Sequence, residues 1–151
     1  MTGYVIVKWF HVMMAITALG ANLTYGLWFT RAGREPQYFG FVMRTVRILD
    51  NRIANPAYGL LQLSGFAMTG MAHIPISTPW VLTGLILWVL LIIIAAAGYT
   101  PTLRRGIEAF DAGGAASPAF QQAAARGRTL GILLILIAIV IVWVMVAKPG
   151  G

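Results

Sequence analysis

Two histidines are the residues of this chain best suited to bind a metal or a redox cofactor. His11 lies inside the first long apolar stretch, between Phe10 and Val12, and His73 lies just before a short turn that contains two prolines. An ionisable side chain within a membrane-spanning segment is costly to bury and marks a functional site by default. We therefore take His11 as the leading candidate ligand.

A haem b site needs an axial imidazole, an apolar cleft and donors for the propionates of the porphyrin. Polar side chains share one face of each apolar stretch that carries a histidine, at 100° per residue. His11 supplies the imidazole, and His73 is either a second axial ligand or a partner for a propionate. At most one haem is expected, since the chain holds no further histidine. The candidate cofactor-binding residues are His11, His73, Lys8, Tyr4, Asn22 and Gln62, with His11 and His73 as the candidate metal ligands.

Two other interpretations of the histidines stay open. The first is a copper(I) site, because imidazole and thioether groups bind this ion. Five residues with such side chains are predicted on the outer side of the membrane: Met13, Met14, Met68, Met71 and His73. Met71 lies about 200° around a regular helix from His73, so the two do not face one site, and copper is the minor alternative. A neutral histidine that hydrogen-bonds to Asn22 or Gln62 would instead hold helices together without any cofactor.

The composition places these residues in a membrane protein. Hydrophobic residues make up 59% of the 151 residues and charged residues 10%, whereas about a quarter of a soluble domain is charged. A helix of about 20 apolar residues crosses the hydrocarbon core. We predict a single integral membrane domain, residues 1–151, with spans at about 4–29, 53–73, 79–99 and 129–147. The first stretch is too long for the apolar part of a signal peptide and is predicted to be retained.

The distribution of basic residues predicts the topology. The net charge is +7, and the arginines gather in the connections that follow spans one and three: Arg31, Arg34, Arg44, Arg47, Arg52, Arg104, Arg105, Arg126 and Arg128. Only Lys8 and Lys148 fall near the other side. Because cytoplasmic connections collect lysine and arginine, we predict a multi-pass protein of the bacterial cytoplasmic (inner) membrane with both termini outside. The basic excess needs no nucleic acid as a partner, and the lipid bilayer is the expected one.

The connection between the first two spans carries its own helical pattern. From residue 41 to residue 53, the apolar Val42, Val46 and Leu49 recur at helical spacing, with Arg44 and Arg47 opposite. This pattern predicts an amphipathic helix at the level of the lipid headgroups, and a solvated linker is the alternative. Asn55-Pro56 then predicts a helix start or a kink, because proline lacks an N–H and suits the first turn of a helix. The fold prediction is all-α: a four-transmembrane-helix antiparallel bundle with an amphipathic segment between helices 1 and 2. The short uncharged turn at 74–80 makes spans two and three antiparallel neighbours.

The two histidines are predicted to lie at different depths. If the first span begins near Tyr4, His11 lies about 10 Å below the outer surface, at a rise of about 1.5 Å per residue. The same depth on the second span falls at residues 66–69. His73 is therefore predicted about one turn higher, at the rim of the bundle.

Some activities lack the residues that they need. There is no cysteine, which excludes disulfides and thiolate metal sites. The four acidic residues, Glu35, Asp50, Glu108 and Asp111, are all expected in cytoplasmic connections, whereas proton and cation pumps use carboxylates within the spans. The sequence also holds no glycine-rich phosphate loop and no Ser-His-Asp set. A hydrolase or an ATP-driven function has no support, and no enzymatic activity is assigned.

Short motifs along the chain resemble those of a known family. Their positions are Lys8-x-x-His11, Asn55-Pro56-Ala57, Leu63-Ser64-Gly65, Thr78-Pro79-Trp80 and the stretch 143–149. Together they are similar to the signature of a bacterial family of small four-helix predicted integral membrane proteins of unknown function. This resemblance implies a four-helix membrane fold and no particular mechanism.

The first span also resembles that of the HemJ-type protoporphyrinogen oxidases and of the CopD-type copper proteins. HemJ-type proteins have four helices and hold haem b on a histidine of the first span, which implies haem b on His11. The residues around His11 depart from the HemJ-type pattern, so the resemblance does not extend to the oxidase reaction. We expect a protein that binds haem b near the outer side, for electron transfer or as a redox subunit, with a membrane redox partner or a second copy of itself. A cofactor-free structural or accessory subunit is the alternative, and a porphyrinogen oxidase or a copper-handling protein ranks lower.

Overall fold

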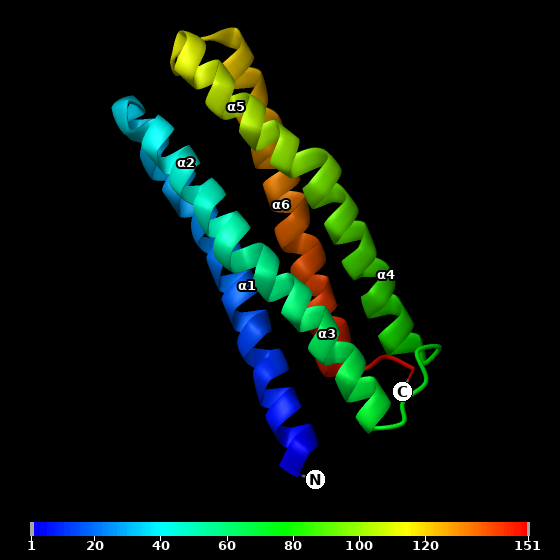
Figure 1. The fold of residues 1–151 in the computed structure, drawn as a ribbon. Helices are drawn as coiled ribbons and strands as arrows, with labels where there is room; N and C mark the ends of the chain where they lie inside the picture. Colours follow the sequence, from blue (N-terminus) through cyan, green and yellow to red (C-terminus); the bar gives the residue numbers. More distant parts are fainter. Residues whose placement is uncertain (1, 151) are drawn as a thin grey trace.

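The computed structural model describes residues 2–150, and this part of the chain contains helices and turns but no strand (Figure 1). The all-α prediction is confirmed. The bounds of the elements are α1 Thr2–Arg34, the 3-10 turn η1 Pro36–Tyr38, α2 Phe39–Leu49, the π-helical segment η2 Asp50–Ala54, α3 Asn55–Met71, α4 Pro79–Ile93, the π-helical segment η3 Ile94–Tyr99, α5 Thr100–Gly113 and α6 Pro118–Ala147. Because α2, η2 and α3 are continuous, as are α4, η3 and α5, the chain forms four long helices.

The four helices form two hairpins that lie side by side (Figure 1). In the first hairpin α1 packs along α3, and in the second α6 packs along α4 and α5. Both termini and the turn at 72–78 lie at one end of the bundle, which we call the terminal end; the turns at 35–38 and 114–117 lie at the other, the loop end.

The two hairpins are joined through α1 with α6 and through α2 with α5. Within residues 2–150, no Cα atom of α3 lies within 8 Å of one in α4. Spans two and three were predicted to be antiparallel neighbours. The corresponding helices α3 and α4 run antiparallel, but they do not pack against each other. The bundle is left unsealed along the α3–α4 edge.

Each π-helical segment comes shortly before a proline. Pro56 and Pro101 have no N–H and cannot donate to the carbonyl four residues earlier, as a regular helix requires. The N–H groups of Asn55 and Thr100 donate instead to carbonyl groups five residues earlier. The wider turn takes up one extra residue before each proline. The helix therefore continues through Pro56, where the sequence had suggested a helix start or a kink.

The tightest part of the core lies in the half of the bundle nearer the loop end. It is built from buried side chains of all four long helices: Tyr25, Ala32, Val42, Met43, Val46, Tyr99, Leu103, Ile107 and Phe120. Four phenylalanines extend it toward the loop end. Phe39 lies 4.9 Å from Phe120 between ring centroids in an edge-to-face arrangement, 6.1 Å from Phe29 and 6.2 Å from Phe110. Aromatic pairs of this kind contribute about 0.5–1.5 kcal/mol each beyond burial, so this cluster joins the two hairpins.

The amphipathic segment has a different partner from the one predicted. Val42 and Val46 are buried in the core between the hairpins, and Arg44 on the opposite side pairs with Asp111 of α5 at 3.1 Å. The amphipathic helix is confirmed, and its level relative to the lipid headgroups stays a prediction. The helix α2 continues into α3 without a break. Its apolar face meets Leu103 and its neighbours on α5, which bury it in protein rather than in lipid.

Three of the four long helices are long and apolar enough to cross a membrane by length and composition: Thr2–Arg34, Pro79–Gly113 and Pro118–Ala147. A helix of 33 residues, such as α1, is about 50 Å long, whereas the hydrocarbon core is about 30 Å thick. Large apolar side chains such as Leu27, Leu63 and Val146 lie on the outside of the bundle, with 72%, 67% and 79% of their surface exposed. This surface is suited to lipid rather than to water.

Candidate functional site

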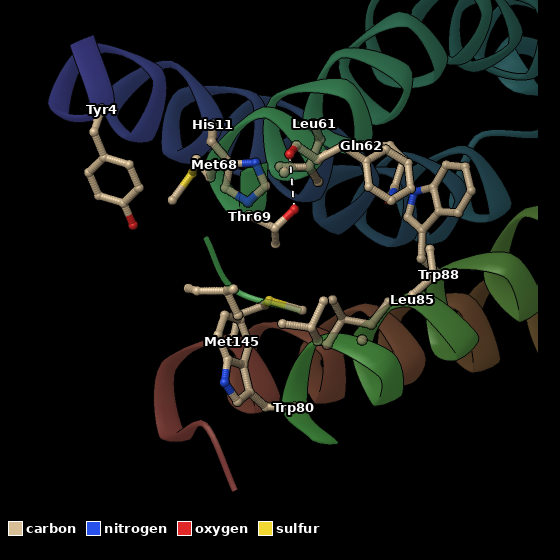
Figure 2. A pocket seen from close by; sticks show the side chains of 16 residues that line it. Tyr4, His11, Leu61, Gln62, Met68, Thr69, Trp80, Leu85, Trp88 and Met145 are labelled. Carbon is tan, nitrogen blue, oxygen red and sulfur yellow. Dashed lines mark hydrogen bonds between the residues drawn. The ribbon is translucent and has the colours of Figure 1, made fainter. Parts of the chain in front are cut away.

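A cavity of about 130 Å³ lies between the two hairpins in the half of the bundle nearer the terminal end. All four long helices contribute to it: Tyr4 and His11 come from α1, and Gln62 from α3 (Figure 2). Trp80 and Trp88 of α4 face them from the other hairpin, together with side chains of α6. The cavity exists because α3 and α4 diverge at this level.

His11 is held by one hydrogen bond to α3. Its Nδ1 lies 3.0 Å from the hydroxyl oxygen of Ser64, which is buried. The single hydroxyl hydrogen of Ser64 is shared between the backbone carbonyls of Leu60 at 2.7 Å and Leu61 at 2.9 Å. Since a serine hydroxyl has only one hydrogen to donate, Ser64 accepts from His11, and the ring carries its hydrogen on Nδ1.

This arrangement leaves the other ring nitrogen of His11 with an available lone pair. Within residues 2–150, Nε2 has no hydrogen-bond partner, and His11 lines the cavity. Histidines that bind metals usually donate their second ring N–H to a fixed acceptor, which sets the tautomer and the orientation of the ring. Ser64 is the fixed acceptor of this kind for His11.

Gly65 allows the ring of His11 to approach α3. A Cβ atom at residue 65 would lie 3.3 Å from Cε1 and 3.7 Å from Nδ1 of His11. The first distance is tighter than ordinary van der Waals contact, so a larger side chain would displace the imidazole. The Leu63-Ser64-Gly65 motif therefore provides both the acceptor and the space for His11.

The rest of the cavity wall is mostly apolar, with polar groups from Tyr4, Gln62 and Thr69. One further polar group of the wall has no partner in the described part of the chain. The indole N–H of Trp88 is buried and has no acceptor among residues 2–150. A buried donor without a partner is costly, by about 1–3 kcal/mol. A ligand that carries an acceptor atom would satisfy it, which makes Trp88 a candidate binding residue that the sequence did not single out.

The structure separates the predicted cofactor-binding residues into two groups. Tyr4, His11 and Gln62 line the cavity. Lys8 is exposed and is not part of the lining. Asn22 lies farther toward the loop end, where its Nδ2 donates to the hydroxyl of Tyr58 at 3.0 Å and to the carbonyl of Ala18 at 2.9 Å; it supports the contact between α1 and α3.

His73 has a structural explanation that does not involve a ligand. It follows the end of α3 with φ at 54°, in the left-handed region, and it is exposed. Its N–H donates to the carbonyl of Gly70 at 3.2 Å, and that of Ile74 donates to Thr69 at 2.9 Å. This pair of bonds is the Schellman motif that closes many helices. His73 lies outside the cavity lining, so the structure does not bring the two histidines together.

The methionines that line the cavity differ from those predicted as copper ligands. Met68 of α3 lines the cavity with His11, whereas Met13 and Met71 are exposed on the outside of the bundle. Met145 of α6 lines the cavity as well, from the opposite hairpin (Figure 2). Its position 134 residues after His11 gave no local signal in the sequence. A thioether pair facing an imidazole is thus present, but from different methionines than those expected.

One acidic residue lies in a different environment from the one predicted. Asp50 is in η2 with only 8% of its surface exposed, inside the first hairpin rather than in a solvated connection. Burial raises the pKa of its carboxyl from 3.8 to about 6. The signal was present in the sequence, because residue 50 follows Val42 and Val46 at steps of four and shares their buried face.

A scan of known families matches residues 5–149 to the family described as predicted integral membrane protein (DUF2269). The chain belongs to this family. The match covers nearly the whole chain and confirms the expected membership in a family of predicted integral membrane proteins whose function is unknown. Neither the curated proteins nor the solved structures contain a match. The functional argument therefore depends on the residues of the site.

Proposed function

We propose that this integral membrane protein binds one haem b through Nε2 of His11 and acts as an electron-transfer or redox subunit. The observation that carries the proposal is the hydrogen bond from Nδ1 of His11 to Ser64. It orients an imidazole lone pair in an apolar cavity, and axial histidines need this orientation. The haem iron supplies one-electron redox chemistry when bound.

The residues present fit haem b in chemistry, and in size they fit it only in part. The donor atom is available, the walls are mostly apolar, and the unpartnered N–H of Trp88 offers a donor to an anionic substituent. The enclosed volume of about 130 Å³ is below the roughly 300–1,000 Å³ of sites that bury larger ligands. A porphyrin must therefore also occupy the unsealed edge between α3 and α4.

We further propose that the helix at 39–71 provides the fourth membrane span with its part from residue 53 onward, and that both termini lie outside the bacterial inner membrane. This helix packs along α1 over its length, so a membrane that surrounds α1 also surrounds it. The exposed arginines Arg31, Arg44 and Arg104 lie toward the loop end, which favours that end as cytoplasmic. At the terminal end, the Lys148 ammonium lies 5.1 Å from the ring centroid of Trp80, a pair suited to the membrane interface.

The test is an absorption spectrum of the full chain purified in lipid nanodiscs from haem-sufficient cells. We expect a Soret band with one haem per chain, lost in His11→Ala and kept in His73→Ala. Loss of haem in both variants would assign His73 as a second axial ligand. A colourless wild-type chain at full yield would overturn the proposal and favour a cofactor-free accessory subunit.

Copper(I) is the second candidate, and the cavity size favours it. Met68 and Met145 line the cavity together with His11, and two thioethers with one imidazole are suitable ligands for a single copper(I) ion. Competition with a copper(I) chelator measures the affinity. Weaker binding in Met145→Leu, with no change in the exposed Met71→Leu, would support this assignment; equal affinity in both variants would exclude it.

A further inference from the structure

Asp50 is a buried carboxyl group with no function in the cavity. It lies in η2, which packs against α1 and is flanked by α2 and α3. Its neighbours on the chain, Asn51 and Arg52, are exposed, while Asp50 itself points toward the bundle. In the part of the chain that the structure describes, no cation pairs with it; the ion pairs formed there involve Glu35, Glu108 and Asp111.

Two phenol groups from separate elements lie in the same buried cluster as Val46, which is one helical turn before Asp50: Tyr25 of α1 and Tyr99 of η3. The charge of Asp50 also acts on Tyr58 of α3. The exposed guanidinium groups of Arg47 and Arg52 belong to the same continuous helix as Asp50 and form no ion pair with it across residues 2–150. The titratable groups that face Asp50 are therefore tyrosines, which donate hydrogen bonds but carry no charge at neutral pH.

The hydrogens of these phenols are available to Asp50. Tyr25 has 5% of its surface exposed, and its buried hydroxyl has no hydrogen-bond partner anywhere in residues 2–150. The hydroxyl of Tyr58 accepts from Asn22 and so keeps its own hydrogen to donate. Because an unpartnered buried hydroxyl is rare in a folded chain, the Tyr25 hydroxyl is a donor for which an acceptor is expected.

The backbone at this site is also irregular. Asp50 opens η2 and Tyr99 closes η3, so both groups lie on π-helical turns. Such turns are rare and frequently mark functional sites, because they redirect a side chain that a regular helix would hold elsewhere. The two prolines explain why a π turn forms. These π-helical turns place the Asp50 carboxyl group and the Tyr99 phenol within the same half of the bundle.

We propose that Asp50 is a proton-binding site inside the bundle, with the Tyr25 hydroxyl as the donor that stabilises its ionised form. In the protonated state the neutral carboxyl group is tolerated in its buried position. On release, the O–H bond of Asp50 breaks and the proton passes to water at the loop end, and Tyr25 turns its hydroxyl hydrogen toward the carboxylate. The ligand of this site is a proton, and the site does not depend on a cofactor at His11.

The raised pKa of Asp50, about 6, agrees with this assignment, since it places the exchange close to physiological pH. Asp50 precedes the second predicted span, which begins at residue 53, so the exchange takes place at the loop-side end of the spans. Proton-coupled membrane proteins use buried carboxyl groups within their spans, and Asp50 lies buried at the edge of one.

The test is a pH titration of the full chain in lipid nanodiscs, with ¹³C at the side-chain carboxyl of aspartate, followed by NMR. The chain has two aspartates, Asp50 and Asp111, and the exposed, ion-paired Asp111 serves as the internal control. We expect the signal of Asp50 to titrate near pH 6. Asp50→Asn should remove this signal and Asp111→Asn the other one.

Two further measurements separate a proton site from other buried acids. Tyr25→Phe should raise the midpoint of the Asp50 signal, because the ionised form loses a donor; the exposed Tyr38→Phe should leave it unchanged. A midpoint of the Asp50 signal in the ordinary range of aspartate would overturn the proposal, and so would an unchanged midpoint in Tyr25→Phe. A midpoint that shifts when sodium replaces potassium would indicate a metal-cation site and would also overturn it.

Discussion

The burial of Asp50 predicts that its removal stabilises the protein in a pH-dependent way. The carboxyl group has a pKa of about 6 in the folded chain, against 3.8 when solvated. Because a tenfold change in proton affinity corresponds to about 1.4 kcal/mol, the cost of ionising this group in the folded state is about 3 kcal/mol. Asp50→Asn removes that cost while keeping a side chain of similar size.

The sign follows from the protons bound in each state. The pKa is raised on folding, so the folded chain binds more protons than the unfolded chain between about pH 4 and pH 6. The stabilisation from the bound proton is complete below the unfolded pKa and is lost as the pH rises through the folded pKa. The difference in unfolding free energy between Asp50→Asn and wild type should therefore increase by about 2.5 kcal/mol from pH 4 to pH 8, since pH 4 lies just above the unfolded pKa.

The assay is equilibrium unfolding in mixed micelles, followed by tryptophan fluorescence at several pH values. Titration of His11 and of the other acids affects both proteins equally and cancels in the difference. Asp111→Asn is the matched control, because Asp111 and its partner Arg44 are more than half exposed and such pairs contribute about 0–1 kcal/mol. A difference between Asp50→Asn and wild type that is constant with pH would refute the reasoning.

The remaining predictions concern the cavity and the aromatic cluster. Ser64→Ala removes the acceptor that orients His11 and should weaken binding of haem or metal about 10–100-fold in a titration of the apoprotein; unchanged affinity would show that Ser64 does not set the tautomer. Gly65→Val should reduce binding further, since a Cβ there already lies 3.3 Å from the imidazole, whereas Gly59→Ala, with nothing within 4 Å, should retain it. Phe39→Ala should lower the unfolding free energy by about 3–5 kcal/mol, measured in the same micelles, and leave the absorption spectrum of the folded fraction intact; a loss under 1 kcal/mol would mean that another contact joins the hairpins.

The sequence predicted well where the environment of a residue depends on its own helix. The polar face of the first stretch contains His11, and the apolar face of residues 42–49 is real; both follow from helical periodicity. The residues that surround His11 were harder to predict from the sequence, since Ser64 lies 53 residues away and Met145 is on the last helix. Contacts between distant segments depend on how the hairpins pack, and periodicity carries no information about this.

Two features of the connection between the first two spans share one physical cause. The sequence predicted a separate amphipathic helix there, because Asn55-Pro56 suggested a helix start or a kink, and the burial of Asp50 was not predicted. A π-helical turn instead accommodates Pro56, and the helix continues without a break. The continuous helix directs Val46 and Asp50 toward the other helices rather than toward lipid headgroups or water. Single-residue rules for proline describe the lost hydrogen bond but not this local compensation.

The missing contact between α3 and α4 has a consequence for how the cavity is filled. Helix packing closes the bundle on three sides. If the fourth side faces the acyl chains and His11 holds a ligand, as proposed above, that ligand is expected to arrive by lateral diffusion within the bilayer, after it has partitioned from water into lipid. The apparent affinity then contains the partition coefficient of the ligand, so that occupancy follows its amount per lipid rather than its concentration in the surrounding solution.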